Sequence, residues 1–473
     1  MNGQAANAFD PRLTALVVAS TSFMASLDAT IITLAMPHMA DSFGVQPITV
    51  TIGITIYIVV MATIMPASAW IADRFGPRRV LAVAITGFTL ASILCGISRS
   101  IEAFAAARAL QAACAALMSP VGNQILFRVT PKNRIVTAVA ISTTPALVAP
   151  VIGPPLGGMI ITALSWPWIF FLNVPISLVA MGLTLRFIPR IGRAAPRPFD
   201  WRGFFLLGAA FACVIYGLEE AARLRGSPAL PIGLIVAGIG FGVAAVRHML
   251  TTPHPVVSLG AVRVRTFVAT TLTGGVLVRI PFRGLNLILP LMLQGVLGFN
   301  AFWAGLLLLG YNGGDLALKA VAGRILRHTG FRSALTVSAV LTALATAGLM
   351  LIDAGTPWIV AMVALILAGA VRSVLFTGMM ALTFADVPPD ELPYATILNN
   401  IGAQVTGAFA VSFTALLLSG SAALRGGDPG HLALADYRAA MLAIAVIGLG
   451  AAWVFLRLPG DAGAEVSGHR TAG

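Results

Sequence analysis

Two short stretches resemble each other and indicate a duplicated fold. They are AWIADRFGPRRVL at residues 69–81 and GRILRHTGFRSAL at residues 323–335. They align with a constant offset of 254 residues, so that Gly76 matches Gly330 and Arg78 matches Arg332. Each stretch places arginines and a glycine between two long apolar runs. The repeat therefore predicts two related halves separated by an insertion.

The apolar runs around these stretches are typical of the whole chain. Of its 473 residues, 58% are hydrophobic and 10% are charged, whereas soluble domains carry about 25% charged residues. A helix that crosses a bilayer needs about 20 apolar residues. Fourteen runs of about this length occur, at residues 13–36, 48–72, 80–98, 101–127, 135–164, 168–189, 201–220, 229–248, 266–291, 302–322, 333–353, 357–383, 395–420 and 437–458. The sequence predicts an all-α integral membrane protein with fourteen transmembrane helices.

The position of the repeat divides these helices into six, two and six. Internal duplication is typical of secondary transporters, whose substrate site lies between the repeats. We expect an N-terminal six-helix bundle, a segment with cytoplasmic connectors and two extra linker helices, a C-terminal six-helix bundle and a cytoplasmic tail. Their predicted bounds are residues 1–188, 189–265, 266–458 and 459–473.

The arginines and lysines are distributed unevenly between the two sides of the predicted membrane. With the N-terminus inside, nineteen fall in inner segments and five in outer segments, and this bias predicts that both termini are cytoplasmic. It also explains the net charge of +13 without a nucleic-acid partner, because no soluble domain is present to bind one. The three cysteines lie in apolar runs, so a disulfide framework is not expected.

Five motifs in chain order resemble those of the major facilitator superfamily, specifically its fourteen-span drug:proton antiporters of the EmrB/QacA type. They are LDATIITLAMP (27–37), ASAWIADRFGPRRVL (67–81), RALQAACAALMSP (108–120), VAPVIGPPLGG (148–158) and SWPWIFFLNVPI (165–176). The MdtD-like branch is indicated by LVRIPFRG (277–284), Lys319 and Arg372. The resemblance implies a proton-coupled exporter of small molecules in the bacterial inner membrane, working by alternating access.

Asp28 is a carboxylate inside the first apolar run. The alternative is a residue that snorkels to the outer surface. Asp28 lies some 12 Å from the end of that run, at about 1.5 Å per helical residue, and its short side chain cannot snorkel so far. Burial raises a carboxyl pKa, and such a group can bind and release a proton. The resemblance assigns proton coupling to Asp28 and to Arg108 in the fourth run. The alternative for Arg108 is an arginine tethered to the outer interface.

The residues expected to control conformational change are Asp73, Arg74, Gly76, Arg78, Gly153, Pro154, Gly157 and Gly158. An acid among arginines at a helix end can lock two helices together, and breaking the lock would permit the halves to rock. Prolines bend a helix, and glycines allow close helix contact. For the arginines the alternative is a topology signal alone, and for the glycine–proline segment it is a generic kink.

The second half carries an excess of positive charge within its apolar runs. Charge inside a bilayer costs at least about 2.5–3.5 kcal/mol per residue. Arginines can also serve structurally, by binding helix carbonyls or acids of another span. Otherwise they predict an electropositive cavity, with substrate-binding candidates Arg279, Arg283, Lys319, Arg372, Asn399 and Gln404.

Three functional readings follow. The first is multidrug export, and the second is export of an organic anion such as a di- or tricarboxylate bound by the arginines. The third is a transporter-like sensor or scaffold. The expected partners are a small-molecule substrate, protons and the lipid bilayer, while a periplasmic adaptor is left open. The six histidines show no metal-ligand spacing and no P-loop occurs, so we expect no cofactor, no metal and no enzymatic activity.

Overall fold

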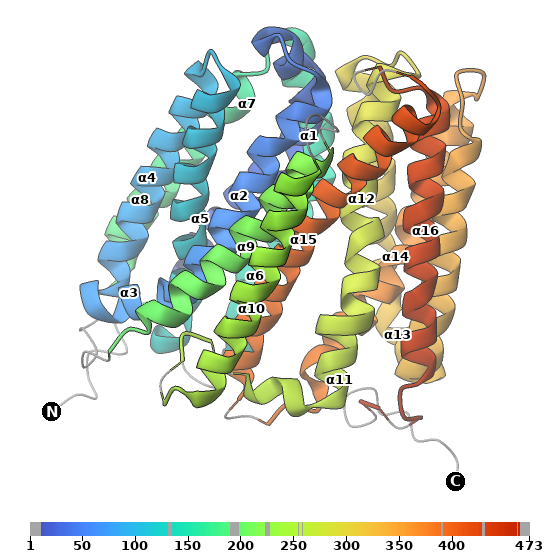
Figure 1. Cartoon of the computed structure of the whole chain (residues 1–473). Coiled ribbons are helices and arrows are strands. Elements are labelled where there is room, and N and C mark those ends of the chain that lie inside the picture. The colour runs from blue at the N-terminus through green and yellow to red at the C-terminus, as the bar shows by residue number, and fades with distance from the viewer. Residues whose placement is uncertain are drawn as a thin grey trace, which may run out of the picture.

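The fold is that of a bundle of long helices, seen in a computed structural model (Figure 1). The structure describes residues 11–130, 135–189, 198–222, 228–253, 255–257, 259–388, 391–427, 431–460 and 462–463. No strand occurs among these residues. Residues 190–197 of the predicted connector segment 189–265 and most of the predicted tail 459–473 lie outside the described residues.

The helices before residue 188 pack together as a group, here called the first bundle. They are α1 (Pro11–Phe43), α2 (Thr51–Ile64), α3 (Ser68–Phe75), α4 (Pro77–Ile97), α5 (Ile101–Val129), α6 (Ile135–Ala163), α7 (Trp168–Phe171) and α8 (Asn173–Phe187), with short 3₁₀ turns η1 (Pro47–Val50) and η2 (Met65–Ala67). Local signals set their ends. Gly44, at φ +66°, follows α1, and the Ser100 hydroxyl accepts a hydrogen bond from the Ala103 N–H at the start of α5.

Two helices between the halves form a pair, α9 (Trp201–Ala222) and α10 (Ala229–Thr251). Asp200 joins the start of α9 to the end of α10. Its carboxylate accepts hydrogen bonds from the Gly203 and Val256 N–H groups and contacts His248 at 2.7 Å. Burial acts to raise the pKa of Asp200, but these hydrogen bonds and the facing His248 hold it below its ordinary value.

The remaining helices form a second bundle. They are α11 (Arg265–Val268), α12 (Gly274–Gly295), α13 (Ala301–Gly348), α14 (Trp358–Ala385), α15 (Leu392–Leu424) and α16 (Leu434–Leu456). Short turns accompany them: η4 (Gly260–Arg263), the π-helical turn η5 (Ala269–Thr273) and η6 (Leu349–Leu351).

Twelve helical segments among the described residues are long and apolar enough to cross a membrane. Two predicted runs are not among the twelve. Run 135–164 lies in α6, where only Val148–Ala163 is counted, as a shorter apolar helix. Run 302–322 forms the first part of α13, whose 48 residues are interrupted by non-helical backbone at Gly330. The predicted count of fourteen is therefore not confirmed, while the all-helical membrane architecture is.

The two repeated stretches adopt similar backbone geometry. Gly76 ends α3 and begins α4 with φ +92°, and Gly330 breaks α13 with φ +72°. Both conformations favour glycine, because a Cβ would crowd the neighbouring backbone. The 254-residue offset read from the sequence thus matches two equivalent bends.

The bends lie on one face of the molecule, where α3 and α11 are drawn at the bottom of Figure 1. We call it the basic face because it carries Arg74, Arg78, Arg79, Arg263 and Arg265 in and beside these elements. Toward the opposite face, which carries α7, the two bundles touch. The Gln294 side-chain amide of α12 donates to the Leu34 carbonyl of α1 at 3.2 Å.

Candidate functional site

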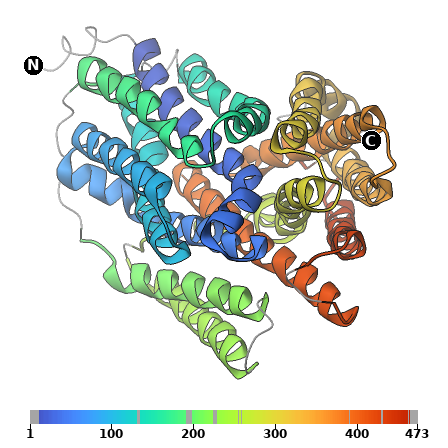
Figure 2. The same cartoon turned by 90° about the horizontal axis from the view of Figure 1, so that it is seen from above.

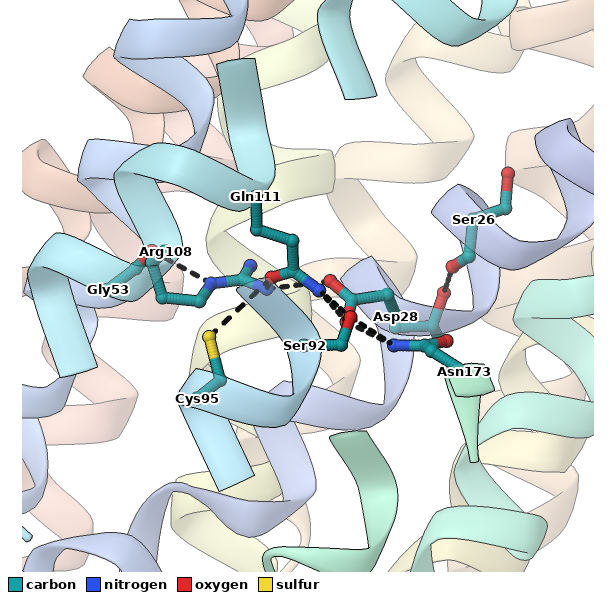
Figure 3. Close-up of polar contacts among 9 residues, drawn as sticks. Ser26, Asp28, Gly53, Ser92, Cys95, Arg108, Gln111 and Asn173 are labelled. Carbon is teal, nitrogen blue, oxygen red and sulfur yellow. Dashed lines mark hydrogen bonds and ion pairs between the residues drawn. The ribbon is translucent and has the colours of Figure 1, made fainter. Parts of the chain in front are cut away.

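Asp28 lies inside the first bundle, enclosed by side chains from α1, α4, α5 and α8 (Figure 3). Its side chain is 2% exposed. Arg108 Nη1 donates to Asp28 Oδ2 at 2.6 Å, and the amides of Gln111 and Asn173 both donate to Oδ1 at 3.0 Å. The structure thus brings together Asp28 and Arg108, two residues 80 positions apart that the sequence singled out.

Arg108 is held on every side. Its Nε donates to the Gly53 carbonyl at 3.3 Å, and its guanidinium lies 4.2 Å from the centre of the Tyr57 ring. A guanidinium stays charged in proteins and stacks on aromatic faces. A buried ion pair of this kind tolerates its desolvation only when further hydrogen bonds satisfy both partners, and these contacts supply them.

Sequence analysis missed two members of this network. Asn173, the first residue of α8, and Ser92 of α4 both join it, since the Gln111 amide donates to the Ser92 hydroxyl at 2.8 Å. Asn173 stands within the quoted motif SWPWIFFLNVPI, and Ser92 interrupts an apolar run. A polar residue within an apolar run was the feature of the sequence that could have indicated them. Their partners on other helices could not be predicted from the sequence.

The next residues of α1 face a different space. Ala29, Thr30 and Thr33 line a cavity of about 130 Å³ between the two bundles. The first bundle also contributes Ile54, Ile58, Pro150 and Pro154, and the second contributes Phe282, Arg283, Asn286, Leu287, Leu308, Asn312 and Val411. Asp28 does not line this cavity, although its neighbours in the chain do.

Among the described residues that line the cavity, Arg283 is the one that carries a charge. None of the described residues forms a hydrogen bond or ion pair with its guanidinium, which lies 5.7 Å from the Phe282 ring. Gly407 of α15 leaves room beside it, because a Cβ there would meet Nε at 3.4 Å. Arg283 is therefore placed to meet a bound molecule.

The other predicted substrate residues are engaged elsewhere. Arg279 is buried and donates to the Thr271 carbonyl at 3.0 Å and to Asn399 Oδ1 at 2.9 Å. It therefore binds the π-helical turn η5 and α15, as the structural alternative anticipated.

Arg372 is likewise buried, stacked between the rings of Tyr311 and Phe282 at 4.4 and 4.5 Å. Its Nη2 donates to Asp315 Oδ2 at 2.8 Å. The spacing of Asp315 and Lys319, four residues apart in the sequence, predicts an ion pair along one helix. That prediction is wrong, because no ion pair joins them within the described residues and Arg372 of α14 takes this position.

Gln404 lies at the contact between the bundles, with its amide nitrogen 2.7 Å from the Met61 sulfur of α2. Neither Gln404 nor Lys319 is among the residues that line the cavity.

Asp73 forms its contacts within the first bundle. Its Oδ1 accepts from Arg128 Nη2 at 2.7 Å and from Gln124 Nε2 at 2.8 Å, and both donors lie on α5. Arg74 is exposed, whereas Arg78 donates to the Leu185 carbonyl at the end of α8. Asp73 therefore joins α3 to α5 and not to its neighbouring arginines.

The glycines of α6 have two separate roles in packing. A Cβ at Gly153 would press on Thr30 at 3.3 Å, and one at Gly157 would meet Ile31 at 2.6 Å, so both allow α1 to lie close. A Cβ at Gly158 would collide with the Ala301 carbonyl of α13, and one at Gly305 with the Pro154 carbonyl. Gly158 and Gly305 thus permit a close crossing between the two bundles.

Comparison with known families decides what this architecture belongs to. The model of the Major Facilitator Superfamily matches residues 18–411 and 271–471. The chain belongs to this superfamily. It is 32% identical to the multidrug resistance protein MdtD of Cronobacter sakazakii over 450 residues, 94% of each chain, and 31% identical to MdtD of Escherichia coli over the same share. The MdtD-like resemblance is confirmed.

Solved structures share the fold at low identity. A bacterial homolog of the human lysosomal transporter Spinster, in an inward-facing conformation, has a TM-score of 0.64 at 16% identity, covering 96% of this chain and 97% of its own. A D-xylose–proton symporter has a TM-score of 0.65 at 14% identity, covering 95% and 98%. The solved structures agree with the family match in fold. The chain is therefore a multi-pass membrane transporter of small molecules and not an enzyme.

Proposed function

We propose that this transporter is a proton-coupled exporter of the multidrug type, working by alternating access. The observation that carries the proposal is the Asp28–Arg108 pair, an ionisable carboxylate fully enclosed in the first bundle beside a cavity shared by both bundles. A buried carboxylate in a membrane protein marks a proton path more often than a structural contact.

The proposed topology is fourteen spans with both termini in the cytoplasm of a bacterial cell and the basic face inward. It counts α6 and the two parts of α13 as spans, in two six-helix bundles flanking α9 and α10, with bounds at residues 188, 265 and 458. The clustering of arginines on one face supports this orientation.

The proposed cycle uses the charge of Asp28. In the described state its carboxylate holds Arg108, Gln111 and Asn173 together, and so joins α1 to α5 and α8. Protonation from the outer side removes the acceptor charge and loosens α1, and release to the cytoplasm restores it. Each inward proton supplies about 2.3 kcal/mol per 100 mV of membrane potential and about 1.4 kcal/mol per pH unit.

The gating residues complete the proposal. Asp73, Gly76 and Arg78 hold α3 and α4 on the basic face, and Gly158 permits the crossing of the bundles near the opposite face. Alternation between inward-open and outward-open states requires the contacts between the bundles to form and break, while those of Asp73 and Arg78 hold the helices of the first bundle together.

The test is proton-driven efflux of ethidium from liposomes containing the purified chain. Asp28→Asn keeps the side-chain size and removes the titratable group, so we expect efflux to fall to the background of empty liposomes while the protein remains folded. Asp41→Asn, an exposed acid on the same helix, is the matched control and should retain wild-type efflux. Undiminished coupling in Asp28→Asn would refute the proposal.

A second candidate substrate is an organic anion such as a di- or tricarboxylate, and Arg283 favours it. Within the part of the chain that the structure describes, Arg283 offers unpaired guanidinium donors and the cavity lining holds no acid. A guanidinium binds carboxylates in a bidentate manner. If anions are the cargo, Arg283→Ala abolishes their transport and leaves dye efflux intact, whereas exposed Arg332→Ala changes neither. Loss of dye efflux without any anion transport in the wild type favours the multidrug reading.

A further inference from the structure

Within the part of the chain that the structure describes, α9 makes the main contacts of the helix pair α9 and α10 with both bundles. α9 packs against α2 of the first bundle and α15 of the second, and α10 lies on its far side (Figure 2). α9 therefore spans the boundary across which the two bundles must move.

The lower part of α9 makes apolar contacts. Leu206, Leu207 and Phe211 pack in one cluster with Ile401 of α15, and a Cβ at Gly208 would press on Thr63 of α2 at 2.8 Å. Such contacts have no directional requirement, so they permit sliding between the bundles.

The upper end of α9 is different, because it carries the buried carboxylate Glu219. Thr51 Oγ1, at the start of α2, lies 3.2 Å from Glu219 Oε1 and shares its one hydrogen between that oxygen and the Ile48 carbonyl at 2.6 Å. Ser412 Oγ of α15 donates to Glu219 Oε2 at 3.4 Å. The three residues are 6%, 1% and 0% exposed. One side chain thus bonds to one hydroxyl from each bundle.

These bonds lie toward the face where the bundles are already in contact. The amide of Gln294 reaches the Leu34 carbonyl there, and Gly158 approaches Ala301. If this side opens, α2 and α15 separate, and at least one of the two Glu219 bonds must break. A directional bond between buried groups resists that separation, whereas the apolar contacts below it do not.

We propose that Glu219 is a gating residue, by which the extra helix pair holds α2 to α15 and stabilises the state closed on the face opposite the basic face. The inference rests on the proposed alternating-access function. It assigns to α9 and α10 a part in the conformational balance, beyond occupying the boundary between bundles.

The experiment measures that balance directly by double electron–electron resonance. Spin labels at Arg99→Cys and Ala354→Cys report the separation of exposed loops on either bundle, in a background with Cys95, Cys114 and Cys213 replaced by alanine. Removing both bonds with Glu219→Leu should raise the ratio of separated to closed molecules about tenfold. Glu220→Leu, at the adjacent acid, should leave the ratio unchanged.

Two further variants guard against a folding defect in Glu219→Leu. Thr51→Val and Ser412→Ala each remove one donor and retain the carboxylate, so each should shift the ratio in the same direction by less. Combining either variant with Glu219→Leu should not shift the ratio beyond that of Glu219→Leu alone, because the effects of residues in direct contact are not additive. Glu219→Gln keeps an acceptor and should restore part of the closed population.

The proposal is overturned if Glu219→Leu and the two hydroxyl variants lower thermal stability but leave the distance distribution unchanged, because that result describes a purely structural contact. Ethidium efflux tests the proposed function separately. A wild-type chain without proton-driven efflux would sink the export function, while the distance measurement would still decide the role of Glu219.

Discussion

The two bundles each contain an Asp–Arg pair, and the two pairs are buried and hydrogen-bonded to different degrees. Asp28 and Arg108 are 2% and 1% exposed, and three donors occupy the two oxygens of Asp28. Asp315 is 24% exposed beside Arg372. Among the described residues, Asp315 Oδ1 and the Nε and Nη1 atoms of Arg372 have no hydrogen-bond partner.

The two halves therefore share their helical arrangement but differ in the polar contacts that join their helices. The first pair is a closed network, in which every change of protonation must disturb several helices. The second is a cation stacked on the rings of Phe282 and Tyr311 with one acid at its edge. We therefore expect the first pair to be sensitive to small changes and the second to tolerate them.

Removing Arg108 should have the largest effect. Arg108→Ala leaves Asp28 buried without its counter-charge, and breaking a buried pair in this way costs about 3–5 kcal/mol. We expect a lower midpoint of thermal unfolding in detergent and a partial rescue by the double variant Asp28→Asn/Arg108→Ala. A midpoint equal to wild type would show that the network does not stabilise the first bundle.

Removing Arg372 should cost less. Arg372→Ala loses one charged hydrogen bond and two ring contacts, about 1–3 kcal/mol, and Asp315 is open enough to gain water. The same unfolding measurement checks it. If Arg372→Ala destabilises more than Arg108→Ala, the contrast between the two pairs is reversed.

The two bends should respond alike, in contrast to the two ion pairs. Gly76→Ala and Gly330→Ala each place a Cβ on backbone at positive φ, at a cost of about 1–3 kcal/mol. The unfolding midpoints of Gly76→Ala and Gly330→Ala should fall by similar amounts. Helical Gly323→Ala, where an added Cβ meets open space, is the control and should not fall. Unequal losses would show that the bends diverged as the ion pairs did.

The contacts of Asp200 beside α9 and α10 should show the smallest effect, and this effect depends on pH. Burial acts to raise the pKa of Asp200, but the hydrogen bonds from Gly203, Val256 and His248 lower it, so they stabilise the fold above the ordinary aspartate pKa. That stability is lost as the pH falls through the lowered value. Wild type should exceed Asp200→Asn by about 0.5–1.5 kcal/mol at pH 7, and the gap should narrow as the pH falls below the ordinary aspartate pKa. A gap that does not narrow there would contradict this account.

The fold was largely predictable from the sequence, and the contacts between helices were not. Apolar runs and the matched Gly76 and Gly330 indicate spans and bends because these depend on local composition. Asp28 and Arg108 were recognised as a pair through the resemblance to a family. Residues such as Asn173 and Glu219 matter through partners on other helices, and hydropathy describes each helix alone.

The arginines of the second bundle illustrate the same limit. Hydropathy places Arg279, Arg283 and Arg372 at similar depth, but it does not say which way a side chain points around its helix. Only Arg283 reaches the cavity, while Arg279 binds η5 and Arg372 pairs with Asp315.

Asp28 and Thr30 are two residues apart on α1, about 200° around the helix, and they border separate compartments. α1 thus separates the carboxylate of Asp28 from the cavity. If Asp28 binds the coupled proton and the cavity binds the cargo, as proposed, cargo and proton do not compete for the same atoms, and acidity should alter the turnover rate more than the cargo concentration needed for half-maximal transport. The width of the cavity can then change in evolution without disturbing the titrating group on the other side of α1.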